Sequence, residues 1–232
     1  MYLTTRLLDP NRQAFVDGFD AALRTVLPPD YLGFLRKFGT GTYAGEVNIG
    51  YPDQAVIPTT FGDYLDLWVF DDAYNETDLL QSTQLASTAN GDILCVASTR
   101  EGQVFVLPRH SEIVNSYPSF FDAVTALLPA GEVYFDPVFE AAWEQISLVE
   151  DTRLLDIDAL HQAFLVHLRT DFVTNVTTQP RYFFQAFGGW VFFDLVYRNG
   201  ITVKYQQSLA PLVQPVLEFL YQQAARLREP GS

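Results

Sequence analysis

Apolar residues recur at helical spacing at the start of the chain. Between Asn11 and Val26 they fall every three or four positions, and Asp9 or Asn11 could cap the helix that this spacing predicts. Two prolines at 28 and 29 end that helix and begin a second one, because proline suits the first turn of a helix. The apolar face of the second helix consists of Tyr31, Phe34, Leu35 and Phe38.

After Gly39 the pattern changes from helical spacing to short apolar runs that are typical of strands. Asn90-Gly91 and Glu101-Gly102 separate three of the runs, which predicts an antiparallel meander. We expect a type I′ turn at Asn90-Gly91, with positive φ at both residues. The runs are Glu46 to Ile49, Tyr64 to Phe70, Gln84 to Ser87, Ile93 to Ala97 and Gln103 to Leu107.

A third helix is predicted from Ser119 to Leu128, because Ser119 can cap it and Asp122 follows three residues later. Pro129-Ala130-Gly131 is then a candidate linker. We therefore expect an α+β protein with two domains, 1–130 and 131–232. The first is expected to hold a mostly antiparallel sheet flanked by helices, and the second to be a smaller α+β domain.

The second half repeats the order helix, helix, strands, helix, although its residues do not align with those of the first half. Helical spacing at Val138, Phe139, Ala142, Trp143 and Ile146 predicts its first helix. The remaining expected elements are a helix from Ile157 to Leu168 behind Asp156, strands from Arg181 to Phe187, Val191 to Tyr197 and Ile201 to Tyr205, and a helix from Leu209 to Arg228.

The chain is strongly acidic. The 232 residues carry 14 basic and 28 acidic side chains, a net charge of −14, which disfavours direct binding of nucleic acid or an anionic membrane. No Lys or Arg lies between Lys37 and Arg100, so we expect a partner with a basic surface. The candidate partner-binding residues are Asp63, Asp66, Asp71, Asp72, Tyr74, Glu76 and Asp78.

Other interpretations of these acidic residues stay open: a solvated acidic loop, or, less simply, a divalent-cation site or an acid/base pair. Aromatic residues beside the acids are typical of interface anchors. Trp68 and Phe70 fit the core better, whereas Tyr74 is the better candidate for an exposed anchor.

Signals for catalysis are weak. Cys95 is the single cysteine, which excludes an intrachain disulfide. It lies in an apolar strand, where a buried and inert thiol is more common than a nucleophile paired with a base such as His110. His161 and His167 are too far apart in sequence to share one turn of a helix as metal ligands. The glycine-rich stretch from Gly39 to Gly45 follows a helix, which indicates a helix end and not a phosphate loop. We expect no enzyme, no cofactor and no metal.

The first residues lack the charged start and apolar run of a secretory signal, and the chain contains no run of 18 apolar residues. Together with the single cysteine, this predicts a reducing, cytoplasmic compartment.

Several motifs between Gln13 and Leu128 occur together in the order of a known family. They are Leu27-Pro28-Pro29-Asp30-Tyr31, Phe34-Leu35, Phe38-Gly39-Thr40-Gly41, Ala89-Asn90-Gly91-Asp92-Ile93-Leu94, Gly102-Gln103-Val104-Phe105 and Ser119-Phe120-Phe121. In this combination the N-terminal half resembles the SUKH superfamily and is similar to the related GAD-like immunity domains of type VI secretion systems. The segment from Glu132 onwards lies outside the resemblance.

The resemblance implies an α+β domain and a bacterial immunity protein that binds and neutralises a polymorphic toxin, often a nuclease. It implies no catalytic residues; Pro28, Gly39, Gly41, Gly91 and Asp92 match positions that look architectural. The alternative is a non-catalytic adaptor or regulatory scaffold. An enzyme is a third and weaker hypothesis. The expected partner is a cognate toxin with a basic surface, and a homodimer stays open.

Overall fold

The computed structural model describes residues 1–62, 67–69, 75–128, 131, 133–150, 153–174 and 177–228. Contacts divide the chain into two compact units. Leu8–Ala130 forms the N-terminal unit, and Gly131–Ser232 together with Met1–Leu7 forms the C-terminal unit. Both units combine helices with strands, so the chain is a mixed α+β protein, as its sequence pattern predicts.

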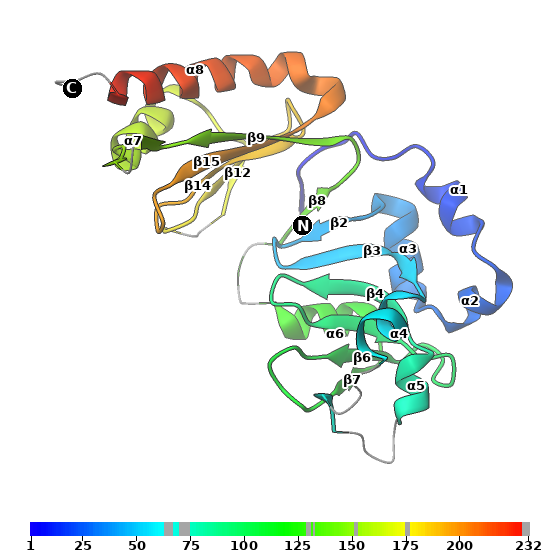
Figure 1. Cartoon of the computed structure of the whole chain (residues 1–232). Coiled ribbons are helices and arrows are strands. Elements are labelled where there is room, and N and C mark those ends of the chain that lie inside the picture. Colours follow the sequence, from blue (N-terminus) through cyan, green and yellow to red (C-terminus); the bar gives the residue numbers. More distant parts are fainter. Residues whose placement is uncertain are drawn as a thin grey trace. The chain divides into compact units, whose positions relative to one another are not determined.

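The N-terminal unit contains a large antiparallel sheet with the strand order β2-β3-β4-β5-β6-β7 (Figure 1). Its strands are β2 (Gly41–Tyr43), β3 (Val47–Asp53), β4 (Thr83–Thr88), β5 (Ile93–Val96), β6 (Val104–Leu107) and β7 (Asn115–Tyr117). Its helices within the described residues are α1 (Arg12–Asp17), α2 (Ala21–Val26), α3 (Pro29–Phe38), α4 (Val56–Phe61), α5 (Glu76–Leu80) and α6 (Phe120–Leu127). The predicted meander is confirmed by β4, β5 and β6.

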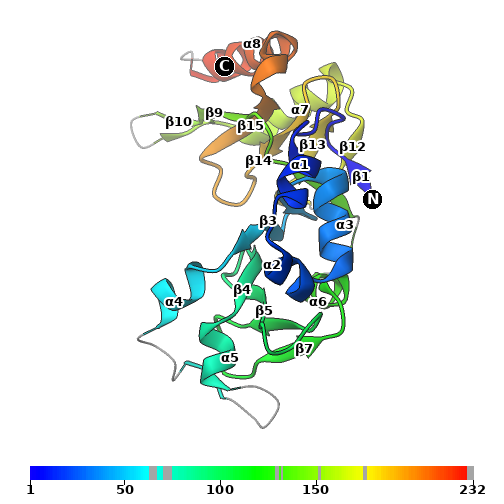
Figure 2. The ribbon, with the colours of Figure 1, turned by 90° about the vertical axis from the view of Figure 1, so that its right-hand side faces the viewer.

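Helices cover this sheet on both sides. Figure 2 shows α4 and α5 on one side of the strands and α3 and α6 on the other. Cys95 and Phe105, which lie opposite each other on β5 and β6, belong to the core under α4 and α5. The alternating residues Leu94 and Val106 are also buried. Burial on both faces explains why these two strands are apolar throughout.

The apolar segment from Asn11 to Val26 forms two short helices instead of the single predicted one. The break comes after α1, where Gly18 ends the helix, and Asp20 begins α2 by accepting a hydrogen bond from the Leu23 amide at 2.8 Å. The side chain of Asn11 makes no capping hydrogen bond. Helical spacing therefore located the apolar face but did not reveal the change of direction between the two helices.

Of the two turns predicted at glycine residues, the structure confirms one and contradicts the other. Gly39 ends α3 with a φ of 77°, so the glycine-rich stretch is a helix end and a hairpin, as predicted. The type I′ turn expected at Asn90-Gly91 is wrong, because positive φ is found at Gly91 but not at Asn90. Ala44 and Gly45, with φ of 53° and 78°, form such a turn between β2 and β3.

The C-terminal unit is built on a second antiparallel sheet, with the order β12-β13-β14-β15-β9. Its described elements are β1 (Tyr2–Leu3), β8 (Tyr134–Pro137), β9 (Ala141–Ser147), β10 (Val149–Glu150), β11 (Arg153–Leu154), α7 (Ile157–His167), β12 (Phe172–Val173), β13 (Arg181–Phe184), β14 (Gly189–Phe193), β15 (Gly200–Gln206), the 3₁₀ helix Gln207–Leu209 and α8 (Ala210–Arg228). Met1–Leu7 belongs here because β1 pairs in parallel with β8.

Both long helices of the C-terminal unit, α7 and α8, pack on one face of its sheet (Figure 1). Phe164 of α7 and Leu220 of α8 join Val191 and Val203 of the sheet in one core. The alternating residues point to the opposite face, where Trp143 on β9 is 55% exposed. This second face carries Trp143, Gln145, Arg181, Trp190, Phe192 and Thr202.

The helix predicted from Val138 to Ile146 is wrong, because Val138 and Phe139 lie in a turn and the residues from Ala141 onwards form β9. In β9, Ile146 lies opposite Ile201 and faces the core, while Trp143 lies opposite Lys204 and points to the other face. The same apolar spacing thus fits a strand once β15, which is distant in sequence, offers a seven-residue ladder from Gly200 to Gln206. No local signal carries that pairing.

Candidate functional site

Most of the predicted partner-binding residues fall outside the described part of the chain. Asp63, Asp66, Asp71, Asp72 and Tyr74 belong to this group, as does Phe70. Two of the predicted residues are described, Glu76 and Asp78, and both lie on α5.

Asp78 is buried, with 6% of its surface exposed, and its carboxylate is hydrogen-bonded inside the N-terminal unit. Oδ2 accepts a hydrogen bond from the Asn75 amide at 3.2 Å, and the Asn75 side chain accepts one from the Asp78 amide at 3.1 Å. The Thr99 hydroxyl donates to Oδ1. This capping box fixes the start of α5, so Asp78 holds the helix in place, whereas Glu76 in the same turn is exposed.

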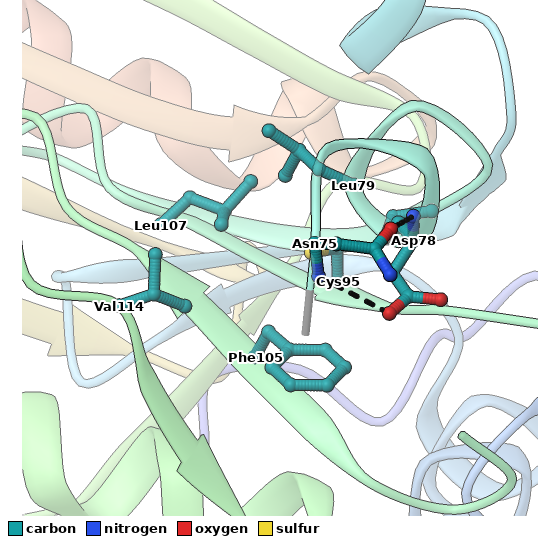
Figure 3. A pocket seen from close by; sticks show the side chains of 8 residues that line it. Asn75, Asp78, Leu79, Cys95, Phe105, Leu107 and Val114 are labelled. Carbon is teal, nitrogen blue, oxygen red and sulfur yellow. Dashed lines mark hydrogen bonds between the residues drawn. The ribbon is translucent and has the colours of Figure 1, made fainter. Parts of the chain in front are cut away.

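A cavity of about 10 Å³ lies between α5 and the sheet, beside Cys95 (Figure 3). Figure 3 shows Leu107, Val114 and Phe105 around it, together with Asp78 of α5 and Asn75, the residue that caps this helix. The space is close to that of a single water molecule, which is too small for a substrate. Val114, the residue that follows Ile113, lines this cavity together with Leu79 of α5, and both belong to the same core cluster.

Cys95 has the environment of an inert thiol. It is fully buried, and burial raises the pKa of its thiol to about 12, with a hydrogen bond from Ser82 acting in the opposite direction. The thiolate is the nucleophilic form of cysteine, and this environment disfavours it. His110, the candidate base for a Cys95 nucleophile, lies after the end of β6 and is exposed.

Three apolar side chains next to α5 point into solvent. Leu67, Val69 and Ile113, which we call the apolar strip, are 45%, 60% and 67% exposed. Val69 forms a parallel β-bridge with Ile113, and its amide donates a hydrogen bond to the Glu112 carbonyl at 2.8 Å. Because Val114 lines the same small cavity as Asp78, the strip lies beside the first turn of α5. Glu112, whose carbonyl bonds to Val69, and Glu76, on the first turn of α5, are both exposed.

Leu67 also lines a larger cleft of about 340 Å³. Trp68 is 6% exposed and donates its indole N–H to the Pro108 carbonyl at 2.9 Å, so it is fixed in the wall of the cleft. The placement of Trp68 in the core confirms the prediction made from its apolar context. The lining residues are Phe61, Leu67, Trp68, Gly91, Ile93, Leu107, Pro108, Arg109 and Ser111.

The two remaining histidines have separate structural contacts on α7. The ring of His161 lies 2.6 Å from the Tyr182 hydroxyl through Nε2, and burial lowers the pKa of this imidazole. His167 Nδ1 lies 2.8 Å from the Ala163 carbonyl. Within the described residues, no group of three or more His, Cys, Asp or Glu side chains is placed to hold a metal ion.

Sequence reasoning missed Val69, Ile113 and Arg109. Ile113 and Val114 are visible in the sequence as an apolar pair between polar residues, but only the structure shows that Ile113 is exposed and forms a bridge to Val69. None of the helices in the described ranges is long and apolar enough to cross a membrane. Comparison with protein-family models, with curated proteins and with solved structures found no match for this chain.

Proposed function

We propose that the protein binds a basic partner protein through the apolar strip and the acidic residues around it. The exposure of Leu67, Val69 and Ile113 on adjoining backbone segments carries this proposal. Protein interfaces combine an apolar centre with a polar rim, and complementary charge speeds association. Two of the three residues belong to the stretch from Lys37 to Arg100 that has no intervening basic residue, so a basic partner fits this surface.

The partner we propose is a cognate bacterial toxin, and the protein is then a cytoplasmic immunity protein. The motifs shared with the SUKH superfamily support this assignment for the N-terminal half. A toxin that acts on nucleic acid needs a basic groove for the phosphates, and an acidic surface can occupy that groove. Binding alone would block the toxin, and no catalytic step is required.

The test begins with identification of the partner and ends with a matched pair of variants. Proteins retained from a source-cell lysate at low salt and released at high salt are identified by mass spectrometry. The supporting result is a stoichiometric basic protein that kills cells when expressed alone and is neutralised by co-expression of this chain. If co-expression of this chain does not increase the number of cells that survive the toxin, the immunity proposal is contradicted.

Ile113→Lys then tests the surface. It replaces an apolar contact with a cation, so the affinity for the purified basic partner should fall at least about tenfold. Val166→Lys is the control, because Val166 on α7 is 79% exposed and lies in the other unit. Equal affinities of the two variants would place the partner elsewhere.

An adaptor or scaffold is the second candidate, and the exposed part of the second face of the C-terminal sheet, around Trp143, favours it; Phe183 and Lys204 on the same face are buried. Trp143 is 55% exposed there, and the Arg181 guanidinium lies over the rings of Trp190 and Phe192 at 5.2 and 5.4 Å. Tryptophan and arginine are enriched at protein interfaces. If the protein is an adaptor, the Trp143→Ala variant should no longer retain the partner proteins from the lysate, while the Ile113→Lys variant should still retain them.

A further inference from the structure

The cleft beside Leu67 has the size and lining of a ligand site. Its volume of about 340 Å³ lies within the range of about 300 to 1,000 Å³ that is usual for such sites. Its walls are mostly apolar and come from four places in the chain: the end of α4, residues 67–68, the start of β5 and the segment after β6. An apolar group of a ligand can leave water there, which favours binding.

The polar groups of the cleft are few, and several are already used. The Trp68 indole N–H is bonded to Pro108. Asp92, next to the lining residue Gly91, accepts hydrogen bonds from the Thr88 hydroxyl and the Arg109 backbone amide, both at 2.9 Å. The groups that remain for a ligand are the Arg109 guanidinium and the O–H of Ser111, whose oxygen already accepts a hydrogen bond from the Ile113 amide at 3.2 Å.

Arg109 is the charged residue of this lining, and it is a cation in an acidic protein. Among the described residues, no carboxylate lies within 4.0 Å of its guanidinium, whereas Arg36 and Arg198 both have such partners. A guanidinium binds a carboxylate through two parallel hydrogen bonds, which gives both strength and orientation. The cleft thus offers an apolar space with a carboxylate-binding group at its rim.

Gly91 gives the Arg109 side chain its place. A Cβ atom at position 91 would lie 2.7 Å from Arg109 Cδ and 3.1 Å from Nη1, and the φ of 91° also favours glycine. The arginine side chain therefore lies directly against the backbone of the turn between β4 and β5.

We propose that the cleft binds the C-terminal residue of a polypeptide, with an apolar side chain in the cleft and the terminal carboxylate on Arg109 and Ser111. Leu67 belongs both to the cleft and to the apolar strip, so a chain that ends in the cleft continues along the strip. The inference deepens the proposed function and rests on it for the polypeptide nature of the ligand.

The test uses the full chain and a fluorescent peptide of five residues that ends in leucine with a free carboxylate. The same peptide with an amidated C-terminus should bind at least about tenfold more weakly, because one charge-assisted pair is lost. The NMR signals of the Trp68 indole N–H and the Gly91 amide should move on binding of the acid. Arg109→Gln should abolish the preference for the acid, and Arg100→Gln, at another exposed arginine of the same unit, should retain it.

Equal affinity for acid and amide, or an Arg109→Gln protein that still prefers the acid, would overturn the inference. N-acetyl-leucine supplies the same carboxylate without a chain; if it binds as tightly as the peptide, the polypeptide source is wrong. The partner experiment separates the two proposals. If the peptide does not bind but Ile113→Lys still weakens the basic partner, this inference fails and the proposed function stands. If Ile113→Lys has no effect, the proposed surface fails first.

Discussion

Lys204 and Asp136 form a buried ion pair in the C-terminal unit, with Nζ 2.5 Å from Oδ1. Lys204 also donates to the Pro137 carbonyl at 2.7 Å, and Asp136 accepts from the Thr4 hydroxyl and the Trp190 indole, both at 2.8 Å. Burial lowers the pKa of Lys204, and the nearby Asp136 carboxylate opposes that shift. One carboxylate thereby joins the N-terminal segment, β8, β14 and β15.

Lys204→Met should lower the free energy of unfolding by about 3 to 5 kcal/mol, because it leaves the Asp136 carboxylate buried without its cation. The measurement is urea denaturation of the full chain. Lys204→Met combined with Asp136→Leu removes both charges and should recover a large part of the loss. A single variant that loses less than about 1 kcal/mol would show that water reaches the carboxylate.

The capping residue and its exposed neighbour on α5 should behave differently. Asp78→Ala removes the capping box and the Thr99 hydrogen bond, so it should lower the free energy of unfolding by about 1 to 2 kcal/mol. Glu76→Ala should stay within about 0.5 kcal/mol of the wild type, since Glu76 is exposed. Urea denaturation compares the two.

The same pair of residues separates stability from binding. Glu76→Lys should slow association with the basic partner, and the effect should shrink at high salt. Asp78→Ala, measured well below its unfolding transition, should leave the association rate unchanged. A slower rate for Asp78→Ala alone would contradict the structural role assigned to this carboxylate.

The sequence predicted those elements whose signals are local. Ser119 caps α6 and Asp156 caps α7, and each side chain accepts the hydrogen bond expected of it. The meander followed in the same way from apolar runs between glycine turns. A cap or a tight turn is decided within four or five residues, so one sequence is enough to find it.

The failures concern contacts between distant residues. β9 was predicted as a helix because its partner β15 lies more than fifty residues away along the chain, beyond any local pattern. Asp136 and Lys204, separated by 68 positions, carry no signal that would pair them. In the candidate site, charge indicated the acidic α5, but Asp78 was assigned to the surface, and the strip formed by Val69 and Ile113 required the fold.

Acid should weaken the C-terminal unit through His161. Burial against Tyr182 and Phe193 lowers the pKa of this imidazole below its ordinary value of 6.5, and the Asp158 carboxylate opposes the shift. The unfolded chain then binds the proton more readily than the folded one. The stability that neutral His161 contributes is complete above about pH 6.5 and decreases as the pH falls from there towards the lowered value.

His161→Gln keeps a polar group near the Tyr182 hydroxyl but cannot titrate. The loss of unfolding free energy between about pH 7.5 and about pH 5.5 should therefore be smaller in this variant than in the wild type. A wild-type pH dependence in His161→Gln would contradict the assignment.

Cys95 should react with alkylating reagents only when the N-terminal unit opens. With a thiol pKa of about 12, the thiolate fraction at pH 8 is about one in ten thousand, and the side chain is fully buried as well. Iodoacetamide should therefore modify the folded chain slowly and the chain in concentrated urea at the rate of a free thiol. Because Cys95 is the single cysteine, mass spectrometry of the intact protein reports this one site. Modification of the folded protein at the free-thiol rate would show an accessible thiolate and would return the nucleophile hypothesis to consideration.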